Sequence, residues 1–125
     1  MTVPKDLLYT AEHEWIRVEG DEAVVGVTDF AQGELGDVVF IEIETMGETL
    51  AQGDTFGTIE AVKTVSDLYM PVDGEVSEVN PALEDTPELV NSDPYKGGWM
   101  IRVKMADPSQ VGDLLSPDQY SSLIG

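Results

Sequence analysis

The sequence contains no cysteine and a single histidine, His13. Without a thiol, the chain cannot form a disulfide, bind zinc through sulfur or use a cysteine nucleophile. One imidazole also excludes a metal site built from several histidines. No spaced loop of oxygen ligands of the EF-hand kind is present either.

Basic residues are scarce: six lysines and arginines stand against 25 acidic residues, which gives a formal net charge of -19. Phosphate backbones and anionic lipid surfaces repel such a chain, so we expect neither nucleic-acid nor membrane partners. The acids are scattered in runs of no more than two, which is typical of a solvated surface. Adaptation to high salt, or partners with basic docking faces, would produce the same composition.

Long apolar runs are also missing. The first six residues lack the basic and then apolar order of a signal peptide, and no run approaches the length of a membrane span. We therefore expect a cytoplasmic protein. The 125 residues suit one domain, residues 1–125, whose core is large enough to be stable without disulfides or metals. We expect this domain to be a monomer.

Short apolar runs rich in β-branched residues dominate the sequence. Several alternate with period two, which predicts strands with one wet and one buried face, and Gly- and Asp-containing turns separate them. This pattern favours a small sandwich or barrel. Helix signals are few: one turn near residues 28–32, and two short helices over 107–115 and 116–123, each with a cap residue followed by proline. Residues 91–95 predict a turn. The predicted strands include 23–27, 38–43, 55–59, 65–70, 74–79 and 99–103.

One of the four lysines, Lys63, lies midway between two predicted strands, 55–59 and 65–70. If these strands pair antiparallel, the turn falls near residues 61–64 and presents the Lys63 amine at a hairpin tip. The flanking Val62 and Thr64 are β-branched, unlike the Asn-Gly or Asp-Gly steps that tight hairpins favour. By pattern alone such a lysine is more often a solvated strand residue, and periodicity does not reveal a modification site.

Segments spread over nearly the whole chain resemble the glycine cleavage H-proteins, in the order found in that family. Residues 57–72, which surround Lys63, resemble the lipoyl attachment region. A single Glu-x-x-Lys would mean nothing, whereas this ordered set is highly specific. The other segments are 9–15, 26–32, 35–39, 87–91 and 97–99.

The resemblance implies a mainly β fold: a hybrid β-sandwich, or flattened β-barrel, of the lipoyl type with short accessory helices, notably at the C-terminus. It implies a lipoyl-binding core of about residues 22–104, a C-terminal helical segment of about 107–124, and lipoate attached covalently to Lys63. The chain would then be a carrier without catalytic activity of its own.

The resemblance also implies partners. A PLP-dependent glycine decarboxylase would load an aminomethyl group onto the lipoyl arm, and a tetrahydrofolate-dependent aminomethyltransferase would take up the one-carbon unit. Dihydrolipoamide dehydrogenase would reoxidise the arm, and a lipoylation enzyme would attach it. Tethering raises the effective concentration of the cargo at each partner.

Three carboxylates are candidates for a pocket that holds the cationic aminomethyl arm. Asp67 lies four residues after the candidate lysine, and Glu14 lies between His13 and Trp15. An ammonium group has three donors and no acceptor, so carboxylates are its natural partners. Glu34 stands where some family members carry a histidine, and would supply a further acid. The alternative is that Glu14 and Asp67 are solvated acids, and that His13 and Trp15 pack at an edge of the core.

Other carriers and an enzyme are the competing functions. Biotinyl domains typically present a lysine between methionines, whereas Lys63 lies between Val62 and Thr64. A lipoyl domain of a 2-oxoacid dehydrogenase normally belongs to a longer chain. A lipoyl relay, or a domain that serves another lipoate-dependent complex, would use the same lysine. A catalytic Schiff-base lysine needs desolvation, which an exposed hairpin does not supply.

Overall fold

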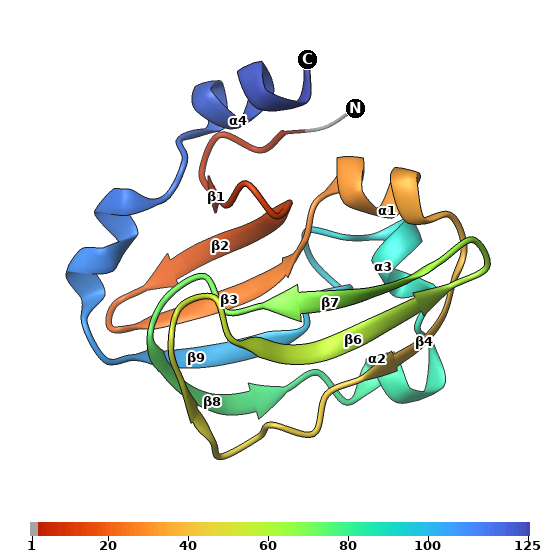
Figure 1. The fold of residues 1–125 in the computed structure, drawn as a ribbon, viewed down its shortest axis with the longest axis horizontal. Helices are drawn as coiled ribbons and strands as arrows, with labels where there is room; N and C mark the ends of the chain where they lie inside the picture. The colour runs from red at the N-terminus through yellow and green to blue at the C-terminus, as the bar shows by residue number, and fades with distance from the viewer. Residues whose placement is uncertain (1–2) are drawn as a thin grey trace.

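The computed structural model describes residues 3–125 as two antiparallel sheets packed against each other, with short helices around them (Figure 1). The larger sheet has the strand order β1-β2-β3-β9-β8-β5 and the smaller has β4-β6-β7. The prediction of a mainly β fold is confirmed. The two sheets do not share a ladder, so the arrangement is a sandwich rather than a closed barrel.

The strands and helices have the following bounds. The strands are β1 (Leu8–Tyr9), β2 (Glu14–Glu19), β3 (Glu22–Val27), β4 (Val38–Glu42), β5 (Thr49–Leu50), β6 (Thr55–Ala61), β7 (Val65–Tyr69), β8 (Gly74–Val79) and β9 (Ile101–Met105). The helices are α1 (Asp29–Leu35), α2 (Ala82–Asp85), α3 (Leu89–Ser92), the 3-10 helix η1 (Pro108–Asp113) and α4 (Pro117–Ile124).

The main apolar core lies between the two sheets. Val25 of β3, Val76 of β8 and Val103 of β9 face it from the larger sheet, and Ile59 of β6 faces it from the smaller one. All four side chains are fully buried or nearly so. Burying one such side chain stabilises the fold by about 1.5–3 kcal/mol. The period-two pattern thus corresponds to a buried inner face on each sheet. The prediction of one wet face is wrong for β3, where Val24 is also buried, because a second apolar cluster covers the outer side of this strand.

The helices follow the capping signals of the sequence, with two additions. Ser116 begins α4 with a capping box that includes Gln119, and Asp107 caps η1, which is a 3-10 helix. Thr28 caps α1 by accepting a hydrogen bond from Ala31 N–H, and α1 continues well beyond the single predicted turn. The sequence did not reveal α2 and α3, because four residues are too few for a helical period. Among the residues that the structure describes, no helix is long and apolar enough to cross a membrane.

A second buried cluster packs α4 against β1 and β2. The rings of Tyr9 and Tyr120 stack with their centroids 4.6 Å apart, and both side chains are fully buried. Trp15 is buried beside them and donates from Nε1 to the Pro94 carbonyl at 2.8 Å. A Cβ at Gly26 would lie 2.7 Å from the Trp15 ring, so only glycine fits there. Trp15 is therefore fully buried in this second cluster, rather than at an edge of the core, and α4 lies beside the N-terminal strand (Figure 1).

Candidate functional site

Lys63 lies at the tip of the hairpin that joins β6 to β7. Glu60 and Val65 are paired in the antiparallel ladder, and Ala61 N–H donates to the Thr64 carbonyl at 2.8 Å across the turn. The side chain of Lys63 is exposed. The predicted position of this lysine at a hairpin tip is therefore confirmed.

The turn forms without an Asn-Gly or Asp-Gly step because the connection between α1 and β4 supports it. Val62 N–H donates to the Asp37 carbonyl of that connection at 2.9 Å. The neighbouring Gly36 has φ of +80°, a conformation that favours glycine. A Cβ at Gly36 would lie 3.4 Å from Cδ and Cε of Lys63, so the stem of the lysine runs along this bare backbone.

Asn91 fixes the same connection from α3. Its Oδ1 accepts from Val38 N–H at 2.9 Å, and its Nδ2 donates to the Gly36 carbonyl at 2.9 Å and to Gln32 Oε1 at 3.0 Å. The turn predicted over residues 91–95 is wrong for its first two residues, which belong to α3. Asn91 thus steadies the backbone on which Lys63 rests.

A cleft of about 390 Å³ lies between the start of β2, α1 and the β6–β7 hairpin. Glu14, Glu34 and Asp67, the three carboxylates singled out in the sequence, all line it. Glu12 is a fourth acid in its wall, which the sequence did not reveal. Leu35 also lines the cleft and directly precedes Gly36, so the cleft lies beside the stem of the candidate lysine.

Glu14 is the buried carboxylate of the cleft, with only 2% of its surface exposed. Its Oε2 accepts from Tyr69 N–H at 3.0 Å, and its Oε1 accepts from Thr10 Oγ1 at 3.0 Å. Burial raises the pKa of Glu14 to about 7, because desolvation of the carboxylate outweighs these hydrogen bonds, which lower it. The interpretation of Glu14 as a solvated acid is therefore wrong.

The remaining carboxylates, Glu12, Glu34 and Asp67, are exposed. They add negative potential at the mouth of the cleft, where water screens each charge strongly. Among residues 3–125, no group of three or more histidine or acidic side chains is placed to hold a metal ion. The acids thus give the mouth of the cleft a negative potential.

His13 forms another part of the wall and has an unusual backbone, with φ of +69°. Its Nδ1 lies 2.9 Å from the Tyr120 hydroxyl, and its ring packs against Phe30 with centroids 4.8 Å apart. Burial lowers the pKa of His13, although the carboxylates of Glu12 and Glu34 oppose this effect. The sequence did not reveal the pairing with Tyr120, because 107 residues separate the two side chains.

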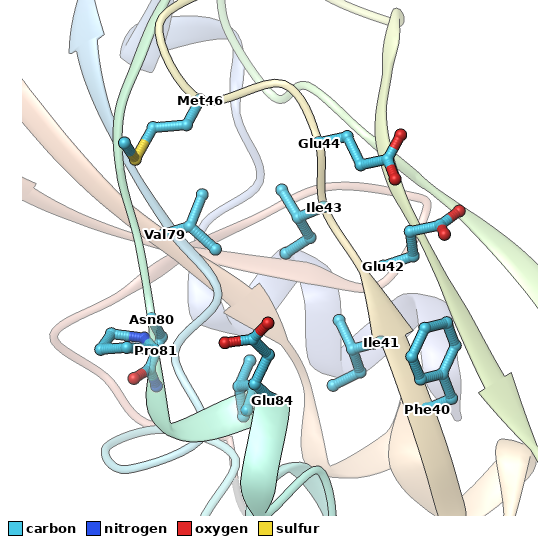
Figure 2. Close-up of a pocket in the computed structure, with 11 residues that line it drawn as sticks. Phe40, Ile41, Glu42, Ile43, Glu44, Met46, Val79, Asn80, Pro81 and Glu84 are labelled. Carbon is cyan, nitrogen blue, oxygen red and sulfur yellow. The ribbon is translucent and has the colours of Figure 1, made fainter.

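A second hollow of about 410 Å³, here called the groove, lies between β4 and α2 (Figure 2). Ile41 and Ile43 point into it, while the intervening Glu42 points away, as alternation along an extended chain requires (Figure 2). Glu84 reaches toward it from α2. No lysine or histidine lines the groove, so the cleft beside Lys63 is the stronger candidate site.

A sandwich of two antiparallel sheets that presents an exposed lysine at a supported hairpin tip, beside an acid-lined cleft, is the architecture of a carrier protein. A family model described as "Glycine cleavage H-protein" matches residues 7–125. The chain therefore belongs to the glycine cleavage H-protein family, a family of lipoyl carriers.

Individual relatives agree with the family model. The glycine cleavage system H protein of Bacteroides thetaiotaomicron is 59% identical over 124 residues, covering 99% of this chain and 98% of the relative. That of Staphylococcus haemolyticus is 54% identical over 125 residues, covering 100% and 99%. The crystal structure of a glycine cleavage system H protein from Mycobacterium marinum matches with a TM-score of 0.90 and 40% identity, covering 98% of this chain and 99% of that one.

Proposed function

We propose that this chain carries an aminomethyl group on a lipoyl arm attached to Lys63, between the enzymes of glycine cleavage. It would receive the group from a PLP-dependent glycine decarboxylase, deliver it to a tetrahydrofolate-dependent aminomethyltransferase, and return to its oxidised state at dihydrolipoamide dehydrogenase. The chain itself catalyses none of these steps, and it works in the cytoplasm. The observation that carries the proposal is the exposed Lys63 amine at a supported hairpin tip beside the acid-lined cleft.

The residues at the tip suit a covalently attached lipoate. The Lys63 amine is accessible to a lipoylation enzyme and can form an amide. Because the chain has no cysteine, the lipoyl group supplies the pair of sulfur atoms that redox cycling requires. The hydrogen bond from Val62 to Asp37 and the bare backbone at Gly36 hold the root of the arm in one place.

The cleft is proposed to shelter the loaded arm between partners. In water an aminomethyl thioether reacts with one water molecule, its C–S and C–N bonds break, and a thiol, formaldehyde and ammonium are released. Ionised Glu14 would hold the ammonium of the cargo, and the exposed Asp67 and Glu34 would add negative potential. Because burial disfavours the ionised form of Glu14, a bound cation would in turn lower its pKa.

The attachment is tested by peptide mass mapping after lipoylation, and carriage by glycine-dependent exchange of CO2 with the decarboxylase. We expect modification at Lys63 alone. Lys63→Arg keeps the positive charge but cannot form the amide, so it should lose both modification and exchange. Its free energy of unfolding should stay within about 0.5 kcal/mol of the wild type.

Lys96→Arg is the matched control, because Lys96 is also exposed, and it should retain modification and exchange. Modification at Lys96 or Lys104, or normal exchange by Lys63→Arg, would refute the proposal. A lipoylated wild type that supports no exchange, but passes its lipoate to another protein, would favour the lipoyl relay instead.

A further inference from the structure

A short chain of hydrogen bonds runs from the cap of α1 to the wall of the cleft. The Tyr120 hydroxyl lies 2.7 Å from Thr28 Oγ1 and 2.9 Å from His13 Nδ1. Thr28 Oγ1 also accepts from Ala31 N–H at 3.2 Å. The side chains of Thr28 and Tyr120 are fully buried, so bulk water cannot complete this chain.

Only one arrangement of donors and acceptors gives an acceptor to the hydroxyl protons of both Thr28 and Tyr120. If Thr28 donates to Tyr120 and Tyr120 donates to His13, each proton has an acceptor and Nδ1 contributes its lone pair. If a protonated Nδ1 donated to Tyr120 instead, Tyr120 would have to donate to Thr28. The Thr28 proton would then have no acceptor among the hydrogen bonds of residues 3–125. An unpaired buried donor is unfavourable. These hydrogen bonds therefore favour the neutral form of His13 with its proton on Nε2.

The charge of His13 matters because of where the ring lies. It lines the same cleft as Glu12, Glu14 and Glu34. The carboxylates of Glu12 and Glu34 raise the pKa of His13, and so favour an imidazolium. An imidazolium in this wall would repel a cationic cargo and compete with it for the carboxylates.

We propose that Tyr120 is a positioning residue of the cleft, whose hydroxyl keeps His13 in the neutral Nε2–H form, so that the wall carries no positive charge opposite the cargo. This inference rests on the proposed function, since only a cationic cargo makes the charge of His13 consequential. It makes the C-terminal helix α4 part of the site, although Tyr120 does not line the cleft.

Nitrogen-15 NMR of the imidazole tests the first half of the proposal, and it needs no assignment because His13 is the only histidine. In the wild type we expect the Nε2–H tautomer with Nδ1 as acceptor. In Tyr120→Phe we expect a mixture of tautomers and a higher His13 pKa. Tyr9→Phe is the matched control: its hydroxyl donates to the Pro4 carbonyl, and its ring stacks on Tyr120 without touching this chain of hydrogen bonds. It should leave the tautomer and the pKa unchanged.

Release of formaldehyde from the loaded carrier tests the second half. For each protein we compare the ratio of the release rate at pH 6.5 to that at pH 8.5. This ratio cancels any effect of a substitution on the release rate that is the same at both pH values. Glu14, whose pKa is about 7, also titrates between these two pH values in every variant. Beyond that shared change, the ratio should be about threefold larger in Tyr120→Phe than in the wild type, because part of its His13 becomes cationic at the lower pH. Tyr9→Phe should match the wild type.

An Nδ1–H tautomer in the wild type, or the same His13 pKa in all three proteins, would overturn the inference. So would a raised pKa with an unchanged release ratio. If Tyr120→Phe fails to fold, the wild-type tautomer still decides, because a proton on Nδ1 contradicts the proposed order of donors. Failure of the proposed function looks different: Glu14→Gln would then release its cargo at the wild-type rate, while the tautomer would be as expected.

Discussion

The cleft and the groove have nearly the same volume, about 390 and 410 Å³, but they hold different polar groups in place. The groove fixes a neutral amide, that of the buried Asn80, whereas the cleft fixes ionisable side chains. Glu14 is buried with two hydrogen-bond donors on its carboxylate, and His13 is held by Tyr120. The acids of the groove are exposed. Size therefore does not distinguish the two hollows; preorganised ionisable groups do. The acidic residues that line the groove are Glu42, whose side chain points away from it, Glu44 and Glu84.

The largest difference between the cleft and the groove is expected for substitutions of Glu14. Glu14→Ala should speed the release of formaldehyde from the loaded carrier by about tenfold or more, because it removes a buried charge-assisted hydrogen bond to the cargo. It also leaves Tyr69 N–H without its acceptor, which should cost about 1–3 kcal/mol in the free energy of unfolding. The measurement is the release rate in the absence of the transferase.

Glu14→Gln separates the loss of the negative charge from the loss of the hydrogen-bond acceptor, which Glu14→Ala combines. Its amide oxygen can still accept from Tyr69 N–H, so the fold should be kept, but the negative charge is lost. Release should be faster than in the wild type although the stability is nearly normal. Equal release rates for the wild type and Glu14→Gln would show that the cleft does not hold the cargo by charge.

The stability of the protein should also depend on pH through Glu14. Its pKa is about 7 in the fold, against 4.5 as the ordinary value, so the folded state binds a proton more tightly than the unfolded state. This contribution is complete below pH 4.5 and is lost as the pH rises through 7, at about 1.4 kcal/mol per unit of pKa difference. Urea unfolding of the wild type and Glu14→Gln from pH 4.5 to 8 isolates it. The wild type should lose stability relative to the variant as the pH rises, and a change in the opposite direction contradicts the assignment.

A smaller effect is expected at the mouth of the cleft. Asp67 is exposed, and exposed ion pairs contribute little, so Asp67→Asn should speed release by about two- to threefold. The effect should vanish at high salt, whereas that of Glu14→Gln should persist. An Asp67→Asn rate as fast as that of Glu14→Gln would mean that the mouth, rather than the buried carboxylate, holds the cargo.

The groove should show no effect at all. Glu84→Gln removes an acid that reaches toward a hollow of the same size. Release should stay at the wild-type rate, and stability should change by no more than about 0.5 kcal/mol. Faster release from Glu84→Gln would show that the net acidity of the protein matters more than the geometry of the cleft.

The sequence predicted those features of the fold that depend on residues close to one another along the chain. Period-two alternation located the strands, and Ser116 followed by proline located the start of α4. The hairpin around Lys63 followed from the two strands beside it. The turn itself lacks the usual residues, because its support comes from Asp37, which lies far from it in sequence.

The features that the sequence could not predict are made by residues distant along the chain. Glu14 is buried because Tyr69, 55 positions later, offers an N–H to its carboxylate. His13 meets Tyr120 across 107 positions. No local pattern distinguishes such an acid or such a histidine from solvated ones. The assignment of three carboxylates to one cleft agrees with the geometry, whereas their roles in holding cargo stay a prediction.

The hydrogen bond from Tyr69 to Glu14 joins the two sheets, since β7 is an edge strand of the smaller sheet and β2 belongs to the larger. Exchange of the Tyr69 amide proton with solvent therefore requires this junction to open. Cargo held in the cleft as proposed would contact the Glu14 side of this junction and would favour its closed form. The protection of one amide proton would then report, without any label on the arm, the fraction of time that the loaded arm spends inside the protein.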